Sequence, residues 1–419
     1  MEMRPLLVLA VSVVLVACDS RSAPNVRELS PGQSRREPES APSRPLTPEP
    51  EAMNRTSPEL MARLRDNAFA YFRFVNRPWV ARVCATFAAD LKSLPVARLH
   101  GDAHIEQFAL TQDAWGLDDF DDAARGPAIV DIVRFLGSVD LAARQRGWPT
   151  DRDALFDRFF DGYRRGLTQP DYVPPAPDIV RRIRSQSHAS RASFLSWGEA
   201  QMQPMTDETV KAVVEGMDAF ARAVERERPD LGLEYFRVSR AGWLRMGVGS
   251  AGGAKVLIRV QGASRDPVDD ELLEAKELGY LGGLGCLEEP PSPPVMRVIL
   301  GTRQLGRLKH NIVANGPDLT IPELVVRGEF RHWWIRSWDP TYREVSVMDL
   351  ESAKDLADLI YDAAVQLGGG SMQEQVGPQG AAVRKEALAS IVRLEKRLRA
   401  EATTLVDDLL LGWQEFRSK

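Results

Sequence analysis

The chain has 419 residues, 44% of them hydrophobic and 27% charged, and its formal net charge is −5. This ordinary globular composition is long enough for a large core and two lobes, and the charge gives no general case for a nucleic-acid partner. The three cysteines, at positions 18, 84 and 286, make neither a metal-binding set nor a disulfide framework. Cys84 and Cys286 have apolar neighbours, so we expect two buried thiols that need not pair.

Residues 1–18 predict a lipoprotein signal peptide. Arg4 precedes an apolar run, Leu6 to Val16, which has signal-peptide length and is too short for a stable transmembrane helix. The run ends in Leu15-Val16-Ala17-Cys18, which resembles the lipobox of bacterial lipoproteins. The resemblance implies that Cys18 is lipidated and anchors the body to a membrane, so that it faces the periplasm or the cell surface. An ordinary cleaved signal or a misassigned start codon is the alternative.

Residues 19–56 predict an extended, disordered tether. Seven prolines lie between Asp19 and Pro50, mixed with Ser, Glu and Arg and with few apolar residues. Such a segment buries too little apolar surface to offset the entropy of ordering it.

Residues 57–234 are expected to form a largely helical lobe that carries a short β segment. Ser57-Pro58-Glu59 signals the start of a helix. The predicted elements are a helical apolar face to residue 74, a helix over 79–91, a strand over 96–99, a hairpin of 108–113 and 116–120, a turn at Gly126-Pro127, a helix over 131–144, and mainly helix over 151–228.

Residues 235–347 are expected to form a β-rich lobe. Its predicted strands cover 236–248, 254–260, 296–300, 324–326 and 332–338, and the segment 271–281 lies among them. Helices over 353–367 and 381–413 predict that residues 348–419 complete the helical lobe. This order of elements predicts an α+β fold.

Two motifs concentrate acidic side chains between apolar segments. They are HGDAHIEQF at residues 100–108 and DDFDD at residues 118–122. Carboxylates held between buried segments must be paired, hydrated or metal-bound, because an isolated buried carboxylate is very costly. Phosphoryl transfer needs one carboxylate that accepts a hydroxyl proton and another that binds Mg²⁺. A set of this kind is available in Asp102, Gln107, Asp119 and Asp121.

Two other interpretations of these acids remain open. His100 and His104, with Asp102 and Asp119, have a spacing that also fits zinc-dependent hydrolases, although no third His or Cys is nearby. The non-functional interpretation is a solvated acidic loop that caps a helix.

A glycine-rich stretch, GVGSAGG at residues 247–253, lies between two predicted strands. Backbone N–H groups of such a hairpin can wrap phosphates, and the candidates here are Gly247, Gly249, Ser250 and Gly252. Lys276 follows 23 residues after the last of these glycines and is a candidate to pair with the α- and β-phosphates, as in kinases. The alternatives are a plain turn and a solvated lysine.

These motifs resemble two families. HGDAHIEQF followed by LDDFDDA and GP is similar to the HGDxHxxN, DFxDA and GP pattern of the aminoglycoside phosphotransferase group of kinase-like enzymes. More closely, residues 57–367 resemble the uncharacterised bacterial family called domain of unknown function 2252. That family's GDAHLENFG, NDFDEA, GP, GVGSVG and AKEA correspond to GDAHIEQFA, DDFDDA, GP, GVGSAG and AKEL here. The FAYFRF segment around Arg73 also resembles the FxFxRG of that family.

The resemblance implies a Mg²⁺- and ATP-dependent phosphotransferase that acts on the hydroxyl of an unidentified small molecule or protein. It implies these roles: Asp102 as the catalytic acid, Asp119 with Asp121 and Gln107 as the metal-binding residues, Lys276 as the phosphate-pairing lysine, Gly247, Gly249, Ser250 and Gly252 as the phosphate loop, His100 as a scaffold residue, and Asp131 as the brace of the catalytic loop.

The order of these parts differs from that of ordinary kinases, in which the glycine loop and lysine precede the catalytic loop. Here they follow it by about 150 residues. We therefore expect a two-lobed protein-kinase-like fold that is circularly permuted, with Lys276 close to Asp119 and the helix over 353–367 in place of the one that normally leads into the catalytic loop.

Two features favour a kinase-like binding module without turnover instead. Gln107 stands where the family has Asn, and its extra methylene shifts the amide, whereas Mg²⁺ tolerates misplaced ligands poorly. A lipid-anchored body outside the cytoplasm also meets little ATP. The sequence therefore leaves two principal hypotheses, the phosphotransferase and the binding module, with the metal-dependent hydrolase third.

Overall fold

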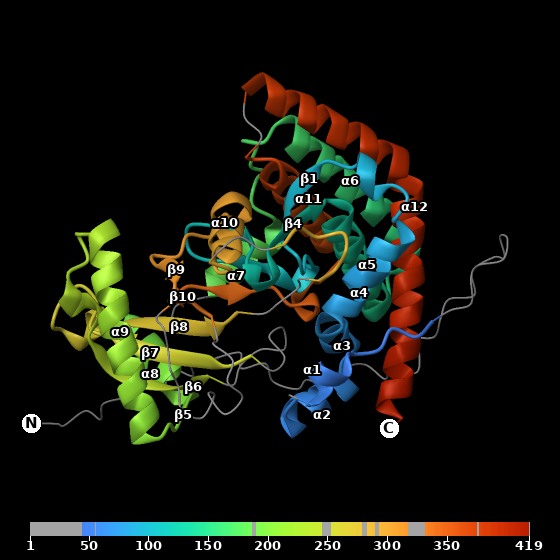
Figure 1. Cartoon of the computed structure of the whole chain (residues 1–419). Coiled ribbons are helices and arrows are strands. Elements are labelled where there is room, and N and C mark those ends of the chain that lie inside the picture. The colour runs from blue at the N-terminus through green and yellow to red at the C-terminus, as the bar shows by residue number, and fades with distance from the viewer. Residues whose placement is uncertain are drawn as a thin grey trace, which may run out of the picture.

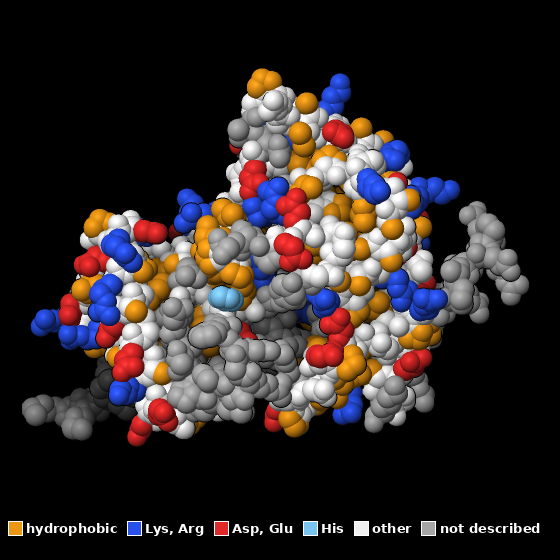
Figure 2. Space-filling view, in the orientation of Figure 1, with side chains coloured by type: hydrophobic (Ala, Val, Ile, Leu, Met, Phe, Trp, Pro, Cys, Tyr) orange, Lys and Arg blue, Asp and Glu red, His pale blue; other side chains and the backbone are white. Residues whose placement is uncertain are grey.

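The computed structural model describes residues 44–54, 56–186, 190–244, 253–278, 283–289, 293–316, 332–374 and 377–418. Cys18 and its lipobox, most of the expected tether, the strand over 324–326, and Gly247, Gly249, Ser250 and Gly252 lie outside the described residues. Within the described ranges, no helix combines the length and the apolar character needed to cross a membrane. Figure 2 shows acidic and basic side chains interspersed over the face of the molecule that it presents.

Helices and sheet separate into two lobes (Figure 1). The helical lobe contains α1 (Pro50–Asn54), α2 (Pro58–Asp66), α3 (Ala68–Phe74), α4 (Asn76–Thr86), α5 (Ile129–Arg146), α6 (Arg152–Thr168), α7 (Asp178–Gln186), α11 (Ala353–Ser371) and α12 (Gly377–Arg417). Two small antiparallel sheets accompany these helices. One pairs β1 (Val96–Leu99) with β4 (Ala124–Pro127), and the other has the order β11 (Arg343–Glu344), β2 (Phe108–Leu110), β3 (Trp115–Leu117).

The second lobe is built on a six-stranded sheet. Its order is β5 (Met202–Gln203), β6 (Val238–Leu244), β7 (Lys255–Val260), β8 (Glu271–Glu277), β10 (Trp333–Ser337) and β9 (Val313–Asn315), with antiparallel neighbours. Two helices, α8 (Arg191–Gln201) and α9 (Asp207–Glu227), belong to this lobe, and α10 (Met296–Leu305) contacts both β9 and α11. The described elements therefore confirm the expected α+β class.

The helical lobe packs around α5, which is buried along most of its length. Its N-terminal turn reaches the acidic motifs, and its C-terminus ends at Gly147 in the left-handed conformation. Against α5 lies the 41-residue α12. Glycines let α6 and α11 approach closely, since a Cβ on Gly166 would come within 2.2 Å of the Val365 carbonyl oxygen. This packing makes α5 a rigid support for the motifs at its N-terminal end.

The main sheet presents two different faces. One face is apolar and packs on α9, through Val256, Ile258, Leu273, Ala275, Trp333 and Ile335. The alternating positions of β7, β8 and β10 point the other way, because successive side chains of a strand alternate between faces. At one end of that opposite face Leu257 and Leu272 pack on α8. At the other end charged residues face the acidic motifs of the helical lobe.

Several predicted elements are confirmed. Ser57 caps α2 and accepts a hydrogen bond from the backbone N–H of Leu60 at 3.2 Å. The strand over residues 96–99 is β1, the expected hairpin is β2 and β3, and the expected helices over 131–144, 353–367 and 381–413 are α5, α11 and α12. The apolar face expected up to residue 74 is divided between α2 and α3, because the Asn67 side chain caps the start of α3.

Two local predictions are wrong. Gly126-Pro127 is the end of β4 and not a turn, and Pro127 sits opposite Val96 at the end of a two-stranded ladder, a position in which proline is tolerated. The segment 296–300 is the start of helix α10 and not a strand. Val298 and Ile299 pack with Val295 and Trp334, a helical spacing that a short apolar run does not reveal.

The lobe boundaries also differ from those expected. Helices α8 and α9 lie before residue 235, yet they cover the two faces of the main sheet. Residues 44–54, expected to belong to the tether, include helix α1 and the buried Leu46. The Leu46 backbone donates to the Asp408 carbonyl oxygen at 3.0 Å and accepts from the Tyr71 hydroxyl at 2.8 Å. The folded body therefore begins before Ser57.

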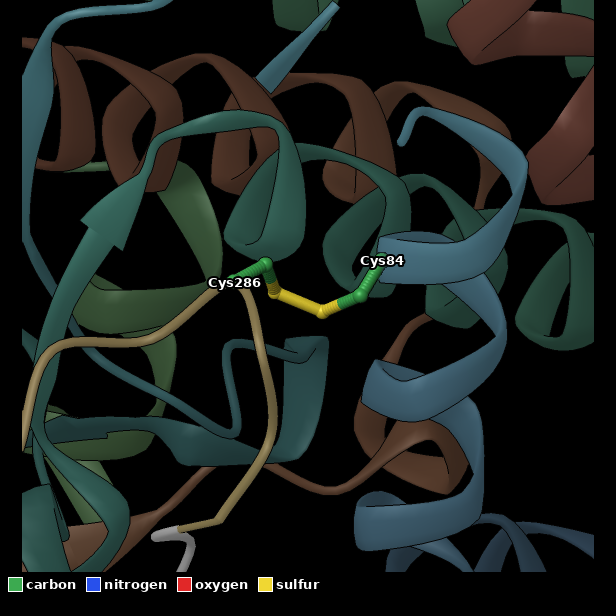
Figure 3. The surroundings of a disulfide bond; sticks show 2 residues. All are labelled: Cys84 and Cys286. Carbon is green, nitrogen blue, oxygen red and sulfur yellow. A yellow bond between two sulfur atoms is a disulfide. The ribbon is translucent and has the colours of Figure 1, made fainter. Parts of the chain in front are cut away.

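Cys84 and Cys286 form a disulfide (Figure 3), which corrects the prediction of two separate thiols. Their Cα atoms are 5.6 Å apart, although 202 residues separate them in the chain. The bond ties α4 to the described segment 283–289, between β8 and α10. A disulfide of this kind is typical of proteins outside the reducing cytosol.

Candidate functional site

The two acidic motifs form a single loop region that is held by the ends of β1 and β4. The side chain of Asp131, at the start of α5, accepts hydrogen bonds from the backbone N–H groups of His100 at 2.6 Å and Gly101 at 2.9 Å. Gly101 has a φ of 85°, and a Cβ there would come within 1.8 Å of the Asp122 carbonyl oxygen. The chain therefore requires glycine at this point, where the first motif passes the second.

Side chains also fasten the two motifs to each other. The His100 Nε2 lies 2.9 Å from the carbonyl oxygen of Asp118, and its ring lies 4.8 Å from that of Phe120. Asn76 of α4 donates from Nδ2 to the Gly101 carbonyl at 3.0 Å and to Asp122 at 2.9 Å. His100 thus has the scaffold position that the resemblance implies, since its ring faces a carbonyl group.

Asp102 is 4% exposed and is held by the buried Arg134 of α5. The Arg134 Nε donates to Asp102 Oδ1 at 2.9 Å, and Nη2 lies 2.8 Å from the same oxygen in the ion pair. The guanidinium stacks on the Phe72 ring at 3.6 Å. Burial alone raises the pKa of Asp102, but the charges of Arg134 and of neighbouring groups outweigh it and hold the pKa well below its usual range. Asp102 is therefore ionised at neutral pH and suits orienting a hydroxyl better than storing its proton.

His104 is fully buried against Phe69 and Phe72, and both of its ring nitrogens lack a hydrogen-bond partner in the described structure. Its Nε2 lies 3.5 Å from Asp102. Burial lowers the pKa of His104 to about 4, although Asp102 opposes the shift, so the imidazole is neutral at pH 7. With His100 directed at a carbonyl and His104 among phenyl rings, the arrangement does not fit a histidine-liganded zinc centre.

Lys276 of β8 joins the sheet lobe to the second acidic motif. Its ammonium donates to Asp119 Oδ1 at 2.7 Å and also pairs with Asp121, and its side chain is 3% exposed. The ammonium lies 5.5 Å from the Trp334 ring centroid. Two residues 157 apart in the sequence, Lys276 and Asp119, therefore meet across the lobes.

The backbone of Asp119 is strained. Its φ is 62°, which places it in the left-handed region, and no other non-glycine residue in the described ranges has a positive φ. This conformation is costly for a residue with a Cβ, and such residues cluster at functional sites. Asp119 begins the short 3-10 turn Phe120–Asp122, which sets Asp121 close to it.

The two carboxylates at Lys276 have opposite pKa shifts. Burial raises the pKa of Asp119, but Lys276 and then Arg336 outweigh it, and the pKa falls well below its usual value. Burial and the charge of Asp119 raise the pKa of Asp121 to about 6, although Lys276 opposes this shift. Burial lowers the pKa of Lys276, but the two carboxylates outweigh it and raise the pKa. The two carboxylates, which repel each other, thus share the ammonium group of Lys276.

A second set of ion pairs crosses the lobes beside the first. Arg336 of β10 donates to Asp118 at 2.9 Å and to Glu274 of β8 at 3.0 Å, and the His310 Nε2 lies 3.1 Å from Asp118. Burial raises the pKa of Glu274, but the charges of Arg336 and Lys276 outweigh it and bring the pKa down to about 2. These contacts fix Asp118, and so the position of Asp119, against the sheet.

Gln107 joins this region through its backbone, since its carbonyl oxygen accepts from the N–H of Asp118 at 2.8 Å. The residue is 6% exposed. Gln107, Asp119 and Asp121 are thus drawn into one region, whereas the described residues offer no group of three or more His, Cys, Asp and Glu side chains that could hold a metal ion. Asp121 Oδ1 is buried and lacks a hydrogen-bond partner in the described structure. Two carboxylates with one unused oxygen fit Mg²⁺, which keeps several waters and needs only one or two carboxylates.

Four residues that position the site were not predicted from the sequence: Asn76, Arg134, His310 and Arg336. Lys255, which lies two positions after the glycine-rich stretch, was not predicted either. Arg134 had a visible signal, because Asp131 and Arg134 are the two charged residues in the apolar stretch from Ile129 to Leu136, and a buried arginine requires an acidic partner. No comparable signal marks Arg336, since its partners come from distant parts of the chain.

A family model matches part of the chain. The family described as an uncharacterized protein conserved in bacteria (DUF2252) matches residues 54–176, which include both acidic motifs and α5. The match ends before the main sheet and Lys276. No curated protein and no solved structure matches the chain.

Proposed function

We propose that the protein is a Mg²⁺- and nucleotide-dependent phosphotransferase that acts on a hydroxyl of an unidentified acceptor. The observation that carries this proposal is the contact of Lys276 with Asp119 and Asp121 across the two lobes. A sheet lysine above an acidic turn is the arrangement by which kinase-like enzymes hold the phosphates on one side and the metal on the other. The strained backbone of Asp119 and the unused oxygen of Asp121 support a role in ligand binding.

In this proposal each residue has one task. Asp119 and Asp121 would hold Mg²⁺, with the Gln107 amide as a further oxygen donor, and the bound ion would neutralise charge on the transferring phosphoryl group. Lys276 would exchange its carboxylate partners for phosphate oxygens when the donor binds. Asp102, kept ionised by Arg134, would orient the acceptor hydroxyl. Gly247, Gly249, Ser250 and Gly252 stay candidates for the phosphate loop.

A circularly permuted, kinase-like order of elements is part of the proposal. Strand β8 follows the acidic motifs in the chain, and its Lys276 nevertheless contacts Asp119 of the second motif. Helix α11 follows the main sheet in the chain and still supports the first lobe, because the Gln366 side chain accepts from the Leu117 N–H at 2.8 Å and donates to the Leu117 carbonyl at 3.2 Å. This is the support that the expected helix over 353–367 would have to give.

We also propose that the body is held outside the cytoplasm by a lipid at Cys18. The lipobox-like Leu15-Val16-Ala17-Cys18 motivates this location, and the disulfide between Cys84 and Cys286 supports it. Because a body outside the cytoplasm meets little ATP, this location does not identify the phosphate donor.

A binding module without turnover is the second candidate. The observation that favours it is the engagement of the proposed catalytic groups with each other: Asp102 is held by Arg134, and Lys276 closes on both carboxylates. Such a site can bind a ligand and still position the acceptor poorly for transfer.

Ligand-dependent melting of the full chain tests the proposal. Because a ligand that binds only the folded state raises the melting temperature, Mg-ATP should raise it, and Zn²⁺ alone should not. Asp119→Asn and Lys276→Met should abolish the response, whereas Lys211→Met, an exposed change on α9, should keep it. A wild-type chain that does not respond to millimolar Mg-ATP would refute nucleotide dependence. Single-turnover transfer from ATP would then separate the enzyme from the binding module.

A further inference from the structure

A second lysine lies beside Lys276 on the sheet face that meets the acidic motifs. Lys255 of β7 is directly opposite Lys276 in the antiparallel β7–β8 pair, and Trp334 of β10 is opposite Lys276 on its other side. Side chains of directly opposed residues project to the same face, with Cβ atoms about 4.5–5.5 Å apart. Lys255, Lys276 and Trp334 therefore form one row across three strands.

The next row of the same face holds an ion pair. Glu274 is opposite Arg336, and the two form an ion pair that also includes Asp118. The first row carries two lysines side by side, and the Lys276 ammonium pairs with the carboxylates of Asp119 and Asp121. Like charges that are directly opposed destabilise a sheet. Burial lowers the pKa of Lys255, and the charge of Lys276 is the next cause of that shift.

Ligand binding changes this balance. Carboxylates that ligate a divalent cation no longer neutralise Lys276, and the row then presents two ammonium groups side by side. In the proposed function the bound cation would take the transferring phosphoryl group, and the two adjacent ammonium groups match two further groups of the phosphate chain. Lysine acts on phosphate as a mobile point charge, so the pair needs no fixed fork geometry.

We propose that Lys255 is a second phosphate-binding residue, and that with Lys276 it makes the site selective for donors with a chain of at least three phosphoryl groups. A nucleoside triphosphate and an inorganic polyphosphate share this chemistry. The inference rests on the proposed function and adds to it the class of donor and the residue that selects it.

Calorimetric titration of the full chain with four magnesium complexes tests the inference: ATP, AMP, inorganic tripolyphosphate and pyrophosphate. Lys255→Met removes one charged contact, so affinity for ATP and tripolyphosphate should fall on the order of 10-fold. Affinity for AMP and pyrophosphate should change much less. Lys255→Arg should keep the preference for the longer chain, and Lys211→Met, which removes an exposed lysine from α9, should leave every affinity unchanged.

The outcomes separate the two proposals. If Lys255→Met binds all four compounds as the wild type does, or loses affinity for all equally, the role of Lys255 is refuted and the phosphotransferase proposal stands. If the wild type binds neither ATP nor tripolyphosphate, the proposed function fails and this inference fails with it. Selective loss for ATP and tripolyphosphate alike supports recognition of the phosphate chain, and loss for one of them identifies the donor. Lys255→Gln repeats the test should the methionine variant melt early.

Discussion

Replacing Lys276 with Met should destabilise the fold in a pH-dependent way. The change removes the cation that separates two carboxylates, Asp119 and Asp121. Removing one partner of a buried ion pair costs about 3–5 kcal/mol of the free energy of unfolding. The Lys276 side chain is 3% exposed, and those of Asp119 and Asp121 are 21% and 16% exposed. Because water reaches the carboxylates, we expect the lower end, about 3 kcal/mol at neutral or higher pH.

The pKa of Asp121 gives the direction of the pH dependence. It is raised to about 6 in the folded protein, so the folded state binds this proton more tightly than the unfolded state does. The stability from this group is present below the unfolded-state pKa and is lost as the pH rises through the folded-state pKa. Lys276 lowers the pKa of Asp121, and its removal raises that pKa further. The variant should therefore lose more stability relative to wild type at about pH 8 than at about pH 5.

Urea denaturation followed by tryptophan fluorescence at these two pH values measures the effect. Adding Asp121→Asn to Lys276→Met removes one of the two repelling carboxylates and should recover part of the loss. The control is Lys211→Met on α9. The Lys211 side chain is 77% exposed, so this change should alter the free energy of unfolding by less than about 0.5 kcal/mol. Equal midpoints for wild type and Lys276→Met at both pH values would refute the assignment of Lys276 as the cation that these carboxylates require.

Three further changes test other parts of the fold. Replacing Cys84 and Cys286 with Ser should cost about 2–4 kcal/mol, and a reductant should lower the melting temperature of the wild type but not of this variant. His104→Leu should reduce the loss of stability on acidification. The buried imidazole has a pKa of about 4, so it favours folding above its unfolded-state pKa, and this contribution is lost as the pH falls. Urea denaturation of wild type and variant between about pH 7 and pH 4 measures the difference. Gly166→Ala should cost about 1–3 kcal/mol, since its Cβ would meet the Val365 carbonyl, and an unchanged urea midpoint would contradict the close approach of α6 and α11.

Local signals in the sequence predicted the strand and the helix that flank the acidic motifs. The apolar strand before His100, the glycine at 101 and the apolar helix after Gly126-Pro127 all act within a few residues, and β1 and α5 follow from them. The meeting of Lys276 with Asp119 was expected from the family resemblance, and the two do lie in contact. Propensity alone does not predict that contact, because the residues lie on different lobes.

Contacts between residues far apart in the sequence determine most of the features that were not predicted. The apolar run 296–300 is compatible with a strand or a helix, and its packing against Trp334 and the acidic turn decides for helix α10. The partner of Cys84 lies 202 residues away, and connectivity over such a span is not readable from spacing. Helices α8 and α9 resemble other amphipathic helices, and nothing in their pattern states which lobe they cover.

The contacts of Leu46 determine which part of the protein would bear a force applied to the N-terminal segment. Leu46 is 2% exposed and is fastened to α12 through the Asp408 carbonyl and to α3 through the Tyr71 hydroxyl, and a Cβ on Gly412 would come within 2.1 Å of its carbonyl oxygen. A pull on the N-terminal segment is therefore taken up by the helical lobe. The sheet lobe, with Lys276, stays off the path of this force.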